Sequence, residues 1–248
     1  MRYWVVMPAA GAGRRFGGAL PKQHWPLVSG TVLDVALQPF VADERCVAIA
    51  LALDAEALGD TSLRSRLPGK VRAIAGGPVR SDSVLNGLDA LAAAASATGA
   101  ATATGTAAAS DWVLVHDAAR PCLSMRDLDS LLLAGALQPH GALLAAPVAD
   151  TLKCADPDQR CERTVERAGL WRALTPQMFR LGALQEALRA ARASGRTPTD
   201  DAQAMEWQGA RALLVEARDA NIKITNREDL AVAEAILAER SRAGKPCA

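Results

Sequence analysis

A loop of small residues follows the first apolar run of the chain and carries the first candidate chemistry. It reads PAAGAGRR at residues 8–15, and without bulky side chains its backbone N–H groups are open to phosphate oxygens. It matches neither the GxGxxG fingerprint, whose third glycine would fall at Phe16, nor a Walker loop. Arg15 and Lys22 follow, and such cations suit a triphosphate whose charge is neutralised as one bond breaks. The alternative is an ordinary strand-to-helix turn with solvated cations.

A second candidate is the segment HDAARP at residues 116–121, after a run of apolar residues that predicts a central strand. Asp117 could hold Mg²⁺, which takes one or two carboxylates together with phosphate oxygens and water. Arg120 could bind a phosphate with its guanidinium fork. The alternative makes Asp117 a helix cap and Arg120 its ion-pair partner. For His116, at the end of the apolar run, we favour a packed structural role.

The histidines do not assemble into a nucleophilic site. The chain has three, His24, His116 and His140, and none falls in a Ser-His-Asp or Cys-His pattern. A phosphate monoester needs no such base, because it is mostly a dianion at neutral pH and can attack directly. Positioning and charge neutralisation then suffice for catalysis.

The elements that must position these residues alternate along the chain. Short apolar runs predict strands buried on both faces, and amphipathic stretches between them predict helices. This βαβ alternation implies a mostly parallel sheet with helices on both faces, in which ligands bind at the carboxyl ends of the strands. The predicted strands are 3–7, 46–53, 71–75, 112–116, 143–148 and 212–216, and the predicted helices are 31–41, 81–95, 124–136, 181–194, 200–207 and 227–240.

Two segments depart from the alternation. Residues 97–110 are rich in Ala, Thr and Gly, which predicts an irregular connection. Residues 151–154 and 163–167 flank a polar turn and predict a hairpin, an arm at about 149–168 on a single domain spanning 1–248. A two-stranded ribbon is only marginally stable alone, so we expect it to pack against a second subunit.

Composition narrows the class of protein. The 248 residues are 50% hydrophobic and 22% charged, which is typical of a globular chain. A formal net charge of +1 and 4% aromatic residues argue against nucleic acid as a partner. Five scattered cysteines without a CxxC pair suggest reduced thiols, and no stretch reads as a membrane span or signal peptide. We therefore expect a cytoplasmic protein.

Seven motifs, in order, carry a resemblance that covers nearly the whole chain. Together they resemble the 2-C-methyl-D-erythritol 4-phosphate cytidylyltransferase family of non-mevalonate isoprenoid biosynthesis. The motifs are PAAGAGRRFGGALPKQ (8–23), GGPVRSDSV (76–84), VHDAARP (115–121), PVADT (147–151), LTPQMF (174–179), TDDAQAME (199–206) and NIKIT (221–225).

The resemblance implies a Rossmann-like α/β fold and a reaction that joins CTP and methylerythritol phosphate and releases pyrophosphate, with Mg²⁺ or another divalent cation. It implies catalytic roles for Arg15, Lys22 and Lys223, and places Asp117 near the metal. The residues that it implies for CTP binding are Ala9, Ala10, Gly11, Gly13, Gly77, Arg80 and Ser83.

For the acceptor, the resemblance implies cations and hydroxyls that suit a polyol phosphate. It also implies a homodimer in which the hairpin arm reaches the neighbouring site, so that Thr151 and Arg167 complete the partner's pocket. Taken singly, Thr151 and Thr175 would be surface-strand threonines and Thr199 a helix cap. The full acceptor set is Asp117, Arg120, Thr151, Arg167, Thr175, Thr199 and Lys223.

The sequence leaves two alternatives and one departure from the family pattern. Pro78 stands where many relatives have a free N–H, so no backbone donation to cytosine is available there. A related ribitol 5-phosphate cytidylyltransferase would share the glycine loop, but tends to carry a bulkier residue in place of Ala119. A catalytically silent nucleotide-binding scaffold would be expected to lose a cation or the carboxylate first, and this chain keeps them.

Overall fold

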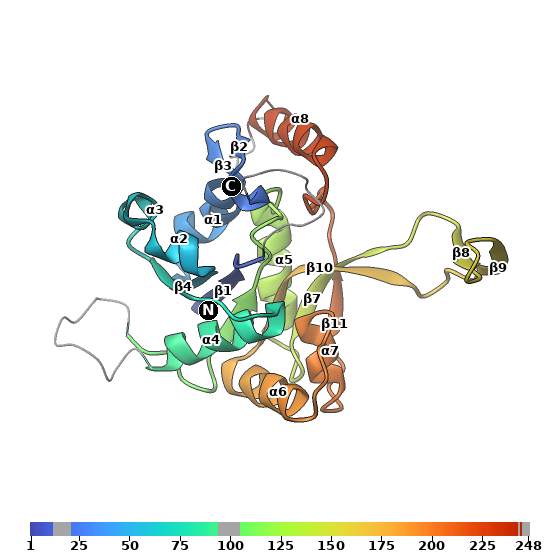
Figure 1. Ribbon diagram of the computed structural model, residues 1–248. Helices are drawn as coiled ribbons and strands as arrows, with labels where there is room; N and C mark the ends of the chain where they lie inside the picture. The colour runs from blue at the N-terminus through green and yellow to red at the C-terminus, as the bar shows by residue number, and fades with distance from the viewer. Residues whose placement is uncertain (12–20, 94–104, 243, 245–248) are drawn as a thin grey trace.

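The computed structural model describes residues 1–11, 21–93, 105–242 and 244 of the chain. A seven-stranded sheet forms its centre (Figure 1). In spatial order the strands are β11 (Leu213–Glu216), β7 (Ala142–Pro147), β10 (Trp171–Arg180), β6 (Trp112–Val115), β1 (Tyr3–Pro8), β4 (Cys46–Leu53) and β5 (Val71–Ala75). The strands β6, β1, β4 and β5 are mutually parallel, and so are β11 and β7. The predicted mostly parallel sheet is confirmed.

Helices cover both faces of the sheet, as the alternation predicts (Figure 1). Alternate side chains of β1 supply the two cores, with Tyr3, Val5 and Met7 on one side and Trp4 and Val6 on the other. The first core includes α1 (Val32–Ala42), α2 (Ala55–Gly59), α3 (Thr61–Arg66) and α5 (Met125–Gly135), and the second includes α4 (Arg80–Ala93), α6 (Leu181–Ala193) and α7 (Asp201–Glu206).

The last helix, α8 (Glu228–Arg242), packs on a third, smaller cluster beside the start of α1. That cluster also holds Cys122 and Ile224, which flank the segments carrying Asp117 and Lys223. Arg240 of α8 donates to the carbonyls of Cys122 and Ala220 at 2.9 Å each. The helix therefore holds two site-bearing segments together. The short elements η1 (Lys22–His24), β2 (Pro26–Leu27) and β3 (Gly30–Thr31) precede α1.

Strand β10 is the main difference from the sequence prediction, which left 171–180 without an element. It runs antiparallel between β6 and β7, and its ladder with β7 is interrupted between Ala173 and Gln177. Thr175 and a cis Thr175–Pro176 peptide lie in this interruption. Irregularities of this kind re-aim side chains. Thr175 is buried, so reading it singly as a surface-strand threonine is wrong.

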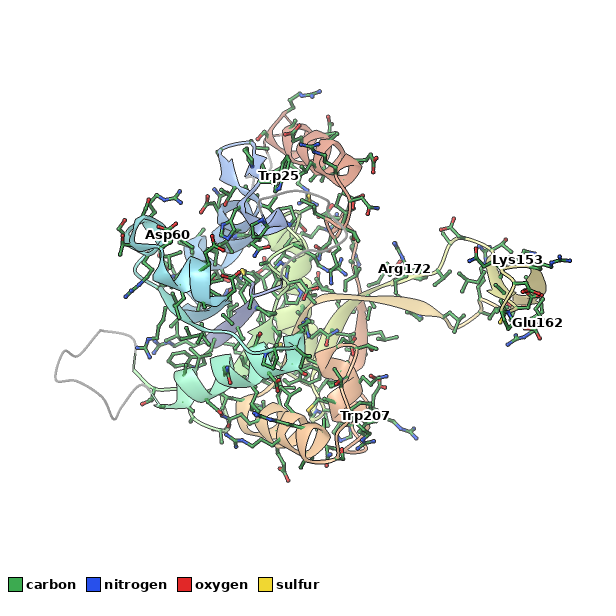
Figure 2. All side chains as sticks on the ribbon, viewed as in Figure 1. Trp25, Asp60, Lys153, Glu162, Arg172 and Trp207 are labelled. Carbon is green, nitrogen blue, oxygen red and sulfur yellow. The ribbon has the colours of Figure 1, made fainter. Side chains whose placement is uncertain are left out.

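The predicted hairpin is confirmed as β8 (Leu152–Ala155) paired antiparallel with β9 (Cys161–Val165). It stands out from the sheet as an extended arm, with Lys153 and Glu162 at its far end and Arg172 where it joins the sheet (Figure 2). The arm contributes no residue to the three apolar cores. Of the predicted irregular connection at 97–110, residues 97–104 lie outside the described part, and 105–110 contain no helix or strand.

No helix in the described part of the chain is both long and apolar enough to cross a membrane.

Candidate active site

A cavity of about 200 Å³ opens at the carboxyl ends of β1 and β6, where the sequence predicts ligand binding. Its walls come from segments far apart in the chain. They are residues 8–11 at the end of β1, 77–80 at the start of α4, 117–119 after β6, and Gln23, Ser83 and Lys223. The cavity thus gathers predicted nucleotide-binding residues Ala9, Ala10, Gly11, Gly77, Arg80 and Ser83 with Asp117 and Lys223.

Two glycines and one serine shape the wall beside α4. A Cβ atom at Gly76 would overlap Ala10, and one at Gly77 would overlap Asp82. Both positions therefore depend on the absence of a side chain. The Ser83 hydroxyl accepts from the Gly77 N–H at 3.0 Å, so Ser83 closes this turn from inside the first turn of α4.

Asp117 is the electrostatic centre of the cavity. Its Oδ1 accepts from Arg80 Nε at 2.9 Å, and its Oδ2 accepts from Lys223 Nζ at 2.7 Å. Arg120 Nε lies 3.9 Å from the same Oδ2. Burial by itself raises the pKa of Asp117, but Arg80 and Lys223 outweigh burial and hold that pKa well below its usual range. Asp117 is therefore a carboxylate at every physiological pH.

Asp201 anchors Arg80 from the opposite side. The Arg80 Nη2 donates to Asp201 Oδ2 at 2.9 Å, and the Asp201 side chain is fully buried. Burial lowers the pKa of Arg80, but Asp201 and Asp117 outweigh burial and raise it above its usual value.

Gln177 on β10 fixes the start of α7, the helix that begins with Asp201. Its amide bonds Asp200 Oδ2 and the Ala202 N–H at 2.9 and 2.8 Å.

Arg120 is buried behind Asp117. Its Nη1 donates to the Asn221 carbonyl at 2.9 Å, whereas its Nε has no hydrogen-bond partner among the described residues. Burial lowers the pKa of Arg120, and the nearby cation Arg172 on β10 acts in the same direction. An unpaired buried donor is costly, so this Nε is suited to an incoming oxygen.

The predicted structural role of His116 is confirmed. The ring is fully buried, packs edge-on against Phe40 and bonds Thr175 and the Arg120 carbonyl. Burial lowers the pKa of His116 to about 4, so it is neutral at physiological pH. Of the alternative for Asp117, the helix cap is wrong, because α5 begins eight residues later and is capped by Ser124. The ion pair with Arg120 is present at 3.9 Å.

Two predicted acceptor residues, Thr151 and Arg167, lie apart from this cluster within one chain. Thr151 and Arg167 lie on the arm and line a separate hollow of about 390 Å³ with Thr164, Val165 and Glu166. Thr199 is exposed and its N–H donates to Gln203, while Asp200 caps α7, so reading Thr199 as the helix cap is wrong. Gly13, Arg15 and the Lys22 side chain lie outside the described part of the structure.

Three supporting residues were not predicted: Gln23, Asp201 and Asn221. Gln23 is buried and its amide donates to the Ala9 carbonyl at 2.8 Å, which ties the glycine loop to η1. Asn221 donates to the Thr175 carbonyl at 2.8 Å. All three fall inside motifs already singled out, so their positions were marked in the sequence although their contacts were not.

The fold and the site define a class of protein. A parallel α/β sheet presents a small-residue loop and a ring of cations around one carboxylate, the arrangement expected of a nucleotidyltransferase that neutralises phosphate charge. A family model described as 2-C-methyl-D-erythritol 4-phosphate cytidylyltransferase matches residues 3–239. The chain belongs to this family, whose members join CTP and methylerythritol phosphate in isoprenoid biosynthesis.

Curated relatives and solved structures agree with this assignment. An enzyme of that name from Acidithiobacillus ferrooxidans is 48% identical over 248 residues, covering 98% of this chain and 99% of the relative. One from Ectopseudomonas mendocina is 45% identical over 243 residues, covering 97% and 98%. A crystal structure of 4-diphosphocytidyl-2C-methyl-D-erythritol synthase matches with a TM-score of 0.78 and 34% identity, covering 95% of this chain and 98% of that one. The Francisella tularensis enzyme matches with a TM-score of 0.77 and 30% identity, covering 95% and 100%.

Proposed function

We propose that this chain transfers a cytidylyl group from CTP to 2-C-methyl-D-erythritol 4-phosphate in the cavity around Asp117. The observation that carries the proposal is the convergence of Arg80, Lys223 and Arg120 on one buried carboxylate at the strand ends. The nucleotide would lie along Ala9, Ala10, Gly11, Gly13, Gly77, Arg80 and Ser83.

The reaction is a displacement at phosphorus. An oxygen of the acceptor phosphate attacks the α-phosphorus of CTP, and the bond from that phosphorus to the bridging oxygen of the β-phosphate breaks. Pyrophosphate leaves with the electron pair of that bond. The attacking dianion needs no general base, so the work of Arg15, Lys22 and Lys223 is to neutralise charge as it builds at the α-phosphorus. A mechanism without a general base is consistent with His116, the buried histidine near the site, which is neutral and bonded to protein groups.

The metal we propose is Mg²⁺, held by Asp117 and the nucleotide together. No group of three or more His, Cys, Asp or Glu gathers as a metal site within the described residues. Mg²⁺ does not need one, because it takes one or two carboxylates with substrate phosphates and water. Asp117 lines the cavity as a permanent carboxylate and so fits this binding mode. When bound, the ion supplies charge stabilisation at the phosphate oxygens.

The acceptor would occupy the side of Asp117 that faces Arg120. The buried Nε of Arg120 offers an unused donor to its phosphate, and Arg172 adds positive charge nearby. Lys223 and Thr199 would bind from the same subunit. Thr151 and Arg167 would come from the arm of a partner subunit, since they do not line the cavity of their own chain and the arm projects out from the sheet (Figure 1). A homodimer would also cover an arm that no core of its own chain supports.

The cytoplasmic location, the single domain over 1–248 and the exclusion of nucleic acid as a partner stay predictions from the sequence. The near-neutral charge supports the last of these.

The test is pyrophosphate release with Mg²⁺ and CTP in three parallel reactions. One contains methylerythritol phosphate, one ribitol 5-phosphate and one no acceptor. We expect turnover with methylerythritol phosphate alone. Turnover only with ribitol 5-phosphate would replace the proposed acceptor, and no turnover with either would favour a silent scaffold.

A further inference from the structure

His116 is buried beside the site, yet the proposed reaction gives it no role. It is the last residue before Asp117, its side chain has no exposed surface, and its ring centroid lies 5.2 Å from that of Phe40. Both ring nitrogens nevertheless have polar partners: Nε2 lies 3.0 Å from the Arg120 carbonyl oxygen and Nδ1 lies 3.1 Å from the Thr175 hydroxyl.

These partners fix where each proton lies. A carbonyl oxygen can only accept, so Nε2 must carry the ring proton. Within the described part of the chain neither nitrogen contacts a carboxylate, and a neutral ring with Nε2–H leaves Nδ1 as an acceptor. The Thr175 hydroxyl therefore donates a hydrogen bond to Nδ1. The same hydroxyl oxygen accepts from the Asp117 N–H at 3.1 Å.

The result is a closed frame around residues 117–120. Thr175 holds the Asp117 end through the N–H, and His116 holds the Arg120 end through the carbonyl. The turn closes on itself, because the Arg120 N–H donates to the Asp117 carbonyl at 3.0 Å. Asn221 completes the frame, since it accepts from Arg120 Nη1 and donates to the Thr175 carbonyl.

We propose that His116 is a positioning residue that, through Thr175 and the Arg120 carbonyl, sets the places of the Asp117 carboxylate and the Arg120 guanidinium. The catalytic part of this proposal rests on the proposed function, whereas the placement of the protons on His116 and Thr175 does not. The Thr175 hydroxyl donates its one hydrogen bond to His116 Nδ1 and accepts one from the Asp117 N–H. It can still accept from a substrate hydroxyl, but it has no proton for a phosphate oxygen.

The proton arrangement is tested first by nitrogen NMR of histidine-labelled protein in the folded, ligand-free state. The chain has only three histidines, so His24→Gln and His140→Gln variants identify the His116 signals without altering it. We expect the Nε2–H tautomer. An Nδ1–H tautomer overturns the proposal, whatever the enzyme turns over.

Kinetics test the positioning role. His116→Phe keeps a ring against Phe40 but removes both hydrogen bonds, and we expect kcat/KM for the acceptor to fall about 10²-fold, as for a site displaced by about 1 Å. The Kd for CTP should stay within roughly twofold, because neither His116 nor Thr175 bonds the segments 8–11 and 77–80, and Asp201 still holds Arg80. His116→Gln, which can still donate to the Arg120 carbonyl, should recover part of the loss. Thr175→Val should resemble the Phe variant, and Thr175→Ser should resemble the wild type.

Phe40→Leu is the matched control, because it disturbs the packing of His116 without touching its hydrogen bonds. It should lower thermal stability and leave kcat/KM near the wild-type value. A His116→Phe enzyme as active as wild type, or a loss shared equally by CTP binding and by Phe40→Leu, would overturn the positioning role. Wild-type protein inactive on every acceptor would instead reject the proposed function, and the tautomer would still decide the proton arrangement. If the His116→Phe variant does not fold, the tautomer measurement on the wild-type protein still decides the proposal.

Discussion

At the scale of single residues, Asp117 and its cations depend on one another. Arg80 is held on two sides by Asp117 and Asp201, and its side chain is 29% exposed. Lys223 has Asp117 as its one ion-pair partner among the described residues, and its side chain is 43% exposed. Substrate phosphates can therefore draw Lys223 away from Asp117 more easily than Arg80. This makes Lys223 the cation best able to follow charge as it moves during the reaction.

We expect Lys223→Met to lower kcat by about 10²–10³-fold, because it removes a charge that acts mainly in the transition state. The Kd for CTP, measured by calorimetry, should change by less than roughly fivefold. Lys70→Met is the matched control, since among the described residues Lys70 Nζ bonds only the Val41 and Asp43 carbonyls, and Lys70 does not line the cavity. An equal loss of CTP affinity and rate would assign Lys223 to ground-state binding instead.

The sequence placed the cavity residues well but not the residues behind them. Asp117 could be predicted from its place after an apolar run, whereas Arg80 and Lys223 could be predicted only through the motifs that carry the resemblance. Asp201 stands in the motif at 199–206, but its role could not be predicted, because that role exists only through Arg80, 121 positions away in the chain. Thr175 was predicted through the resemblance, but its burial was not, because that burial depends on an irregularity in the unpredicted strand β10.

At the scale of elements, prediction succeeded where one kind of periodicity dominates. The bounds of β4 and β5 match their apolar runs, and the N-caps of α1 and α5 are Thr31 and Ser124, the first residues of the predicted helices 31–41 and 124–136. Strand β10 was missed because its buried stretch contains Thr175, Pro176 and Gln177, which interrupt any apolar run. The helices α2 and α3 were missed because five or six residues are too few to show a 3.6-residue period.

The junction between α1 and β1 allows a pH prediction. Asp43 ends α1, accepts from the Tyr3 hydroxyl at 2.7 Å and pairs with Arg45 at 2.8 Å. Burial raises the pKa of Asp43, but the hydrogen bonds from Arg45 and Tyr3 outweigh it and lower the pKa below the unfolded value. The stabilisation is therefore complete above the unfolded pKa of about 4 and is lost as pH falls through the lower folded pKa.

Asp43→Asn should lower the free energy of unfolding in urea by about 1–2 kcal/mol at pH 7, because a charge-assisted pair is lost. The difference from wild type should shrink below about pH 3, where the wild-type carboxylate takes up a proton as well. Asp129→Asn is the matched control, since it also removes a partner of Arg45, but a half-exposed one, and should cost under about 0.5 kcal/mol. A penalty for Asp43→Asn that does not change with pH would contradict this account.

In the whole molecule, the arm is the feature whose stability and role are not explained by contacts within one chain. Its strands are largely exposed, and its hollow lined by Thr151 and Arg167 lies on a segment that projects from the sheet (Figure 2). The proposed dimer would bring that hollow to the Arg120 side of a neighbouring cavity. Each complete site would then contain residues of two chains.

This arrangement predicts complementation between subunits. Arg167→Ala and Arg120→Ala should each raise the KM for the acceptor, and refolding the two variants together should restore part of the activity, because some sites then receive both arginines. Arg163→Ala, on the same arm but outside the motifs, should behave as wild type. Mixtures no more active than the separate variants would argue against arm exchange, and so would a monomeric wild-type protein in sedimentation.

A crystal structure with CTP and Mg²⁺ would show whether the electropositive clamp around Asp117 acts on the α-phosphate of CTP. We expect the Arg15 guanidinium, the Lys22 amine and the Asp117 carboxylate to converge on one triphosphate, with each cation within about 4 Å of a phosphate oxygen. A structure in which these three groups point to separate surfaces, or in which CTP lies away from the cavity, would contradict the account.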